Sequence, residues 1–117
     1  MVADMNPSLA KIEFYVPPSH LEAVKAAMFA AGAGKVGEYD CCAWQTQGRG
    51  QYRGSRHARP FAGEPGRIET IEEYKVEMVC EASRVAQVIE ALKRAHPYEE
   101  PAYSVLALLD PAQFPSG

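Results

Sequence analysis

The order of strand-like and helix-like patterns along the chain is the feature that most restricts its fold. In each half of the 117 residues, a segment with apolar residues at every second position is followed by one with apolar residues at helical spacing, and then by another strand-like segment. The expected strands are residues 11–16, 36–46, 68–80 and 102–109, and the expected helices begin at Ser19 and Ser83. Two β-α-β units with right-handed crossovers predict an α+β fold of the ferredoxin-like βαββαβ type, with both helices on one face of an antiparallel sheet.

Proline and glycine mark the ends of the first helix. Pro17-Pro18 stops the preceding strand, and Ser19 and Glu22 have the spacing of a capping box, in which two side chains satisfy free backbone N–H groups. Gly32 and Gly34 are expected to end the helix, because glycine tolerates the left-handed conformation of a helix C-terminus. A complete βα unit is therefore predicted at the beginning of the chain.

The middle of the chain predicts an arm and a loop rather than regular structure. Gly48-Arg49-Gly50 is typical of a turn, which is expected to lead into a short arm at residues 51–53. Residues 54–67 contain glycine, proline and arginine without a sustained period, which predicts a long loop. We expect one domain over residues 11–110, with a leader at residues 1–10 and a tail at residues 111–117.

Composition restricts the function more than it reveals it. A formal net charge of −3 argues against a protein that binds nucleic acid over its whole surface. No apolar run approaches the roughly 20 residues that cross a bilayer, and the first ten residues lack the pattern of a signal peptide, so we expect no membrane partner and a cytoplasmic location. Cys41, Cys42 and Cys80 encode neither a disulfide framework nor a four-ligand zinc site. Cys41 and Cys42 are expected on a strand, with side chains on opposite faces.

Apolar residues on both faces of the predicted sheet suggest that the chain associates with itself. Tyr39, Trp44, Tyr103 and Leu106 lie in the second and last expected strands, and one layer of helices covers only one face. This favours a homo-oligomer. The alternative is that the long loop folds back over the open face.

A local excess of positive charge predicts an anion site. Residues 45–67 contain one acidic residue, Glu64, and five arginines: Arg49, Arg53, Arg56, Arg59 and Arg67. Arginine offers paired donors to carboxylate or phosphate oxygens, and glycine lets backbone N–H groups approach an anion. Gly48, Arg49, Gly50 and Arg53 are therefore the candidate ligand-binding residues. The alternative is a solvated, mobile loop that charge keeps soluble.

The segment from His96 to Pro101 (HPYEEP) is a candidate divalent metal site. It places an imidazole close to two carboxylates, and these groups are acceptable ligands for zinc or a similar cation. His96 and Glu100 are the candidate ligands, with Glu77 from a neighbouring strand as a third, or a ligand from another subunit. In the alternative, His96 only caps the end of a helix and the glutamates are solvated.

Four separated segments resemble one known family. Residues 31–39, 42–50, 66–77 and 96–103 look like the insert domain of YqfO-type proteins, also called Nif-three-like or GTP cyclohydrolase type two, and the match covers about residues 10–109. The resemblance implies a CutA-like and PII-like, trimer-forming domain with a loop that reaches a subunit cleft. Full-length members also carry a dinuclear metal centre outside this domain, which is not expected here. After the glycine turn this chain has Tyr52-Arg53-Gly54 where the family has a phenylalanine and proline arm.

Three functions follow from these features. The first is a non-catalytic module, a homotrimer, that binds a small anion or a metal ion at subunit junctions. The second is an accessory domain whose apolar sheet face binds a partner protein. The third is a small metal-dependent hydrolase that uses His96 and the glutamates around a bound water.

Overall fold

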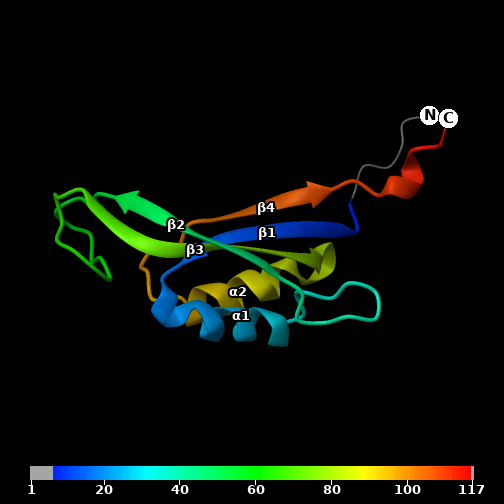
Figure 1. Ribbon diagram of the computed structural model, residues 1–117, viewed down its shortest axis with the longest axis horizontal. Helices are drawn as coiled ribbons and strands as arrows, with labels where there is room; N and C mark the ends of the chain where they lie inside the picture. Colours follow the sequence, from blue (N-terminus) through cyan, green and yellow to red (C-terminus); the bar gives the residue numbers. More distant parts are fainter. Residues whose placement is uncertain (1–6, 117) are drawn as a thin grey trace.

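The fold is one antiparallel sheet with two helices on one of its faces (Figure 1). The computed structural model describes residues 7–116. The strands, in the sheet order β2-β3-β1-β4, and the helices are β1 (Leu9–Val16), β2 (Trp44–Tyr52), β3 (Glu69–Glu81), β4 (Tyr103–Leu108), α1 (Leu21–Ala30) and α2 (Val85–Ala95). The predicted α+β class and the layer of two helices are confirmed.

The core lies between the sheet and the helices. β1 pairs with both β3 and β4, so it is central, and its alternating residues Ile12, Phe14 and Val16 are fully buried. Val24 of α1 and Leu92 of α2 pack on them from the helical layer. The apolar residues that recur at every second position in β1 and at helical spacing in α1 and α2 therefore pack into the same core.

The first helix ends as expected but begins differently. A short 3-10 helix, Pro18–His20, comes before α1, and the Ser19 hydroxyl lies 2.8 Å from Nδ1 of His20 instead of capping the helix. The predicted capping box is therefore wrong. Gly32 adopts a φ of 115°, and the helix ends just before it, as predicted.

The second strand lies further along the chain than its pattern predicts. Residues 36–43, expected to belong to a strand, form a turn with one bridge between Val36 and Tyr39, and Cys41 has a φ of 54°. The prediction that Cys41 and Cys42 point to opposite faces of a strand is therefore wrong. Gly48-Arg49-Gly50, expected as a turn, lies inside β2, because the long β3 offers hydrogen-bonding partners all the way from Glu77 to Glu69.

The ends of the chain differ modestly from expectation. β1 begins at Leu9, inside the segment expected to be a leader, and residues 1–6 of that segment lie outside the described residues. Near the other end, a short 3-10 helix spans Pro111–Gln113 and is capped by Asp110, whose Oδ1 accepts a hydrogen bond from the N–H of Ala112 at 2.9 Å. None of the described helices is long and apolar enough to span a membrane.

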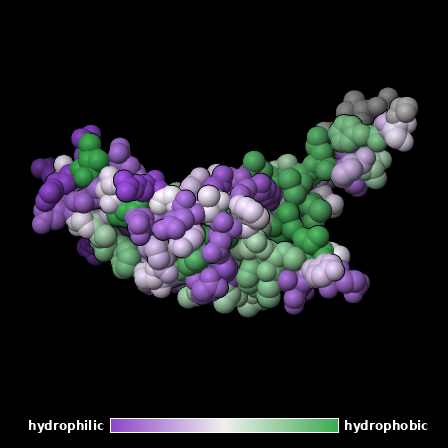
Figure 2. All heavy atoms as spheres, in the orientation of Figure 1, coloured by the Kyte–Doolittle hydropathy of each residue, from purple (hydrophilic) through white to green (hydrophobic). Residues whose placement is uncertain are grey.

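The face of the sheet away from the helices is open. Figure 1 shows both helices below the sheet and no element of residues 7–116 above it. The long loop does not fold back over this face; its Phe61 packs at one end of the sheet, against His20 and Tyr98. At the other end, Figure 2 shows apolar side chains gathered towards the C-terminal segment, and Leu9 and Leu106 are each 42% exposed there.

Candidate functional site

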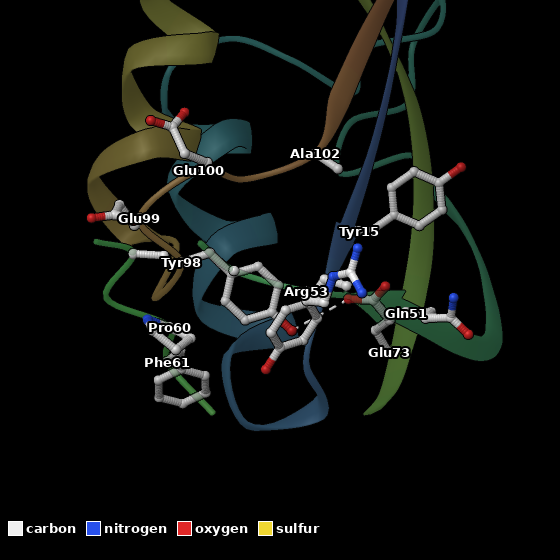
Figure 3. A pocket seen from close by; sticks show the side chains of 13 residues that line it. Tyr15, Gln51, Arg53, Pro60, Phe61, Glu73, Tyr98, Glu99, Glu100 and Ala102 are labelled. Carbon is white, nitrogen blue, oxygen red and sulfur yellow. Dashed lines mark hydrogen bonds between the residues drawn. The ribbon is translucent and has the colours of Figure 1, made fainter. Parts of the chain in front are cut away.

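The arginine-rich loop and the HPYEEP segment meet at one pocket, although they are far apart in the sequence. The pocket has a volume of about 380 Å³ and lies where β2 runs into the loop, beside the turn that follows α2 (Figure 3). Tyr52, Arg53 and Gly54 line it from the loop side, and Tyr98, Glu99 and Glu100 line it from the turn. The sequence predicted these two segments as separate sites.

Glu73 of β3 places a carboxylate in the wall of this pocket. Its Oε2 accepts a hydrogen bond of 3.3 Å from the hydroxyl of Tyr98. Burial raises the pKa of Glu73, because the charged form loses contact with water. A Cβ atom on Gly50 would overlap the Glu73 carboxylate, so glycine at this position of β2 makes room for it.

Tyr98 is held by its neighbours on several sides. Its ring centroid lies 4.7 Å from that of His96 and 5.9 Å from that of Phe61, and Phe61 in turn packs edge-on against His20 at 5.5 Å. Burial is the main cause that raises the pKa of Tyr98, and the nearby Glu73 charge raises it further. The phenol is therefore a neutral hydrogen-bond donor. This row of rings attaches the loop to the turn after α2.

His96 is buried and both of its ring nitrogens have partners. Its Nδ1 accepts a hydrogen bond of 3.1 Å from the N–H of Tyr98, so Nε2 carries the proton and donates to the carbonyl oxygen of Tyr15 at 2.6 Å. Burial lowers the pKa of His96, which keeps the ring neutral. In this arrangement His96 positions Tyr98, and neither nitrogen is available to a metal ion.

The candidate metal ligands do not come together within one chain. Glu77 lies on the open face of the sheet and binds Lys11 at 2.6 Å, and this ion pair lowers the pKa of Glu77. Glu100 is exposed and lines the pocket, which Glu77 does not. Residues 7–116 contain no group of three His, Cys, Asp or Glu side chains that could hold a metal ion. A site completed by a second copy of the chain stays a prediction.

The candidate anion-binding residues are also divided. Arg53 lines the pocket, is exposed, and has no ion-pair partner among the described residues. Arg49 and Gly48 lie in the middle of β2, opposite Glu72 and Glu73, and do not line the pocket. Gly50 does not line the pocket, and its lack of a side chain leaves room for the Glu73 carboxylate.

Sequence reasoning missed several residues of the pocket: Tyr15, Tyr52, Phe61, Glu73 and Tyr98. Tyr98 lies within the HPYEEP segment, so its neighbours could have pointed to it. The register of β3 against β2 places Glu73 opposite Gly48, with its carboxylate against Gly50, and no local sequence pattern predicts this register.

Comparisons with known proteins agree with this fold. No family model matches the chain. It is 46% identical over 104 residues to a GTP cyclohydrolase 1 type 2 homolog of Mycobacterium leprae, which covers 89% of this chain and 27% of that protein. Among solved structures, a Bacillus cereus protein related to NIF3 has a TM-score of 0.73 and 34% identity, over 92% of this chain and 29% of the other.

A second kind of structure shares the fold alone. CutA1 of Shewanella sp. SIB1 has a TM-score of 0.66 and 14% identity, over 89% of this chain and 84% of the other. The chain spans about a quarter of the length of the curated relatives that it matches. It is therefore related to one part of the YqfO-type, NIF3-related proteins, as its sequence motifs predict, and it has the fold of CutA.

Proposed function

We propose that this domain is a non-catalytic module that binds a small ligand and acts as a homo-oligomer. The observation that carries the proposal is the pocket of about 380 Å³ in which the arginine-rich loop meets the HPYEEP segment. Its volume is within the range of about 300–1,000 Å³ that is typical of small-molecule sites. Aromatic rings form much of its wall, and a few polar groups, Arg53 and Glu73 among them, can orient a ligand there.

The open face of the sheet supports self-association. Leu9 and Leu106 are both 42% exposed, and Trp44, at the other edge of the sheet, is 69% exposed. A second copy of the chain would remove these side chains from water, which is favourable at about 25 cal/mol per Å² of apolar surface. The resemblance to YqfO-type and CutA-like domains makes a trimer the expected form.

The same face also supports the second candidate function, an accessory domain that binds a different protein. Self-association and binding of a different protein remove the same apolar side chains from water, so the exposed face is compatible with both. They differ in what the purified protein does alone. A homo-oligomer assembles without a partner, whereas an accessory domain stays a monomer.

A thermal-shift screen of the purified chain tests ligand binding. The probes are inorganic phosphate, pyrophosphate, zinc chloride, manganese chloride and a set of small amines, amino acids and carboxylates. We expect at least one probe to raise the melting temperature of the wild type, and Arg53→Ala to reduce that increase for probes that carry an anionic group. Arg67→Ala is the matched control, since Arg67 lies in the same loop but outside the pocket and has only a 3.8 Å contact with Glu64.

Native mass spectrometry tests the oligomer and detects retained molecules in the same measurement. Three subunits are expected. A monomer at micromolar concentration would contradict self-association and favour the accessory domain. If no probe stabilises the wild type, or if every stabilising probe with an anionic group stabilises Arg53→Ala as much as the wild type, the pocket is not the ligand site.

A further inference from the structure

The Glu73 carboxylate lacks the partners that a half-buried charge requires. Its one hydrogen bond is the 3.3 Å contact that Oε2 accepts from Tyr98, and in the described part of the chain no Lys, Arg or His nitrogen lies within 4.0 Å of it. A carboxylate away from water is costly unless it is paired. Because Glu73 lines the pocket, a ligand can supply the missing partner.

Aromatic rings surround the approach to this carboxylate. Tyr98 directs its hydroxyl at Glu73 (Figure 3) and its ring packs against Phe61, and Tyr15 also lines the pocket. Tyr52 also lines the pocket, and its hydroxyl donates a hydrogen bond to the carbonyl oxygen of Ala62, which fixes the ring. The faces of aromatic rings attract cations, by about 0.5–2 kcal/mol per contact. Rings around a carboxylate form a typical receptor for an ammonium group.

The charges of the pocket also favour a cation inside it. Three carboxylates line it, Glu73, Glu99 and Glu100, against one cation, Arg53. Glu99 accepts a hydrogen bond of 3.3 Å from the backbone N–H of Arg59. Glu73 is the least exposed of the three carboxylates, and no described cation pairs with it. Arg53 is exposed and lines the same pocket, so it can meet an anionic group on the same ligand.

We propose that the pocket binds its ligand through a protonated amine, which enters between the aromatic rings and pairs with the carboxylate of Glu73. This inference rests on the proposed function, because it names the chemical class of the ligand that the pocket takes. An anionic group on the ligand pairs with Arg53. The ligand class is thus a small amine or amino acid rather than a phosphate or a simple carboxylate.

Three probes of similar size separate these contributions: putrescine with two ammonium groups, 4-aminobutyrate with one ammonium and one carboxylate, and succinate with two carboxylates. Binding to the 117-residue chain is measured by NMR titration at neutral pH. We expect putrescine and 4-aminobutyrate to shift the amide resonances of residues that line the pocket, and succinate to bind at least about tenfold more weakly, since a hydrogen-bonded charge pair is worth about tenfold or more in affinity.

Variants identify Glu73 as the receptor of the amine. Glu73→Gln keeps the shape and the contact with Tyr98, and is expected to weaken both amines about tenfold or more. Glu72→Gln is the matched control, because the neighbouring residue on β3 is exposed and lies on the other face of the strand. Arg53→Ala should weaken 4-aminobutyrate but should not weaken putrescine, which has no anionic group to pair with Arg53. Gly50→Ala should displace the Glu73 carboxylate and weaken both amines, which provides a second test if Glu73→Gln does not fold.

The possible results distinguish this inference from the proposed function. Amine binding that survives both Glu73→Gln and Gly50→Ala overturns the inference. Succinate that binds more tightly than the amines overturns it as well, but leaves the pocket as a ligand site. If none of the three probes binds, the amine class is wrong, and the broader thermal-shift screen decides separately whether the pocket binds any ligand.

Discussion

The two faces of the sheet differ sharply although the same strands supply both. On the helical face, Ile12, Phe14 and Val76 have no exposed surface. On the open face, most of the neighbouring residues of the same strands are charged, all are partly exposed, and Lys11 pairs with Glu77 at 2.6 Å. Successive residues of one strand therefore point into the buried core on one side and towards water on the other.

This difference indicates what each face contributes. Burial of apolar side chains on the helical face supplies most of the stability of a single chain, because the hydrophobic contribution grows with the area removed from water. Exposed ion pairs contribute little to folding, since water already solvates both charges. The open face is therefore free to serve association, and the pocket at its end is free to serve binding.

The largest effect on stability is expected from a cavity on the helical face, and it tests whether this face stabilises the chain more than the open face does. Phe14→Ala removes a fully buried ring from the central strand, and is expected to lower the free energy of unfolding by about 3–5 kcal/mol. Urea unfolding followed by circular dichroism measures it. Leu106→Ala on the open face is the matched apolar truncation and should cost far less. A similar cost for both would show that the open face is as deeply buried in solution as the helical face.

The next largest effect is expected at His96, which connects the core to the pocket. Burial lowers its pKa from 6.5, so the unfolded chain binds a proton at this residue more readily than the folded chain. The stability that depends on neutral His96 is therefore complete above about pH 6.5 and declines as the pH falls through that value towards the lower folded pKa. Urea unfolding at several pH values between neutral and about pH 5 measures the decline.

The variant His96→Gln isolates this contribution. Glutamine does not titrate, so the difference in unfolding free energy between wild type and variant should shrink as the pH is lowered. Glu73 acts in the opposite direction, because its raised pKa favours the folded state at low pH, but it is present in both proteins and cancels in the difference. A difference that is constant with pH would mean that the ring is not held neutral.

The elements of the helical face were predictable from the sequence because each is defined by the pattern of its own residues. The alternation of Ile12, Phe14 and Val16 defines β1 without any knowledge of its neighbours, and Gly32 marks the end of α1. The second strand was not predictable in the same way. Val36 and Tyr39 look like strand residues, yet they are 51% and 74% exposed in a turn. A strand with two glycines forms further along because β3 is long enough to pair with it.

The pocket, too, depends on contacts between distant segments that local sequence patterns do not reveal. Arg53 and the HPYEEP segment were predicted as functional, since charge and spacing are visible in the sequence. Their meeting in one pocket, and the carboxylate of Glu73 beside Gly50, depend on how β2 and β3 pair. The simpler interpretation of His96 located it at the end of α2, where it lies, but its ring nitrogens bond to Tyr15 on a distant strand and to Tyr98, not to the carbonyls of the helix.

The smallest effect on folding is expected on the open face itself. Lys11→Met removes the ion pair with Glu77 and should change the melting temperature very little, because both side chains are solvated. For the same reason the small change should vanish in about 1 M salt, where charges are screened within about 3 Å. Lys35→Met is the control, since Lys35 is an exposed lysine without an ion pair among the described residues.

Association should respond to Lys11→Met more than folding does. In an oligomer that covers the open face, Lys11 and Glu77 are removed from water together, and the loss of one partner leaves the other charge uncompensated. Analytical ultracentrifugation of Lys11→Met should therefore show weaker association, while Lys35→Met associates as the wild type does. If both variants associate equally well, the ion pair lies outside the interface, and the exposed apolar end around Leu9 and Leu106 becomes the part of the face that carries association.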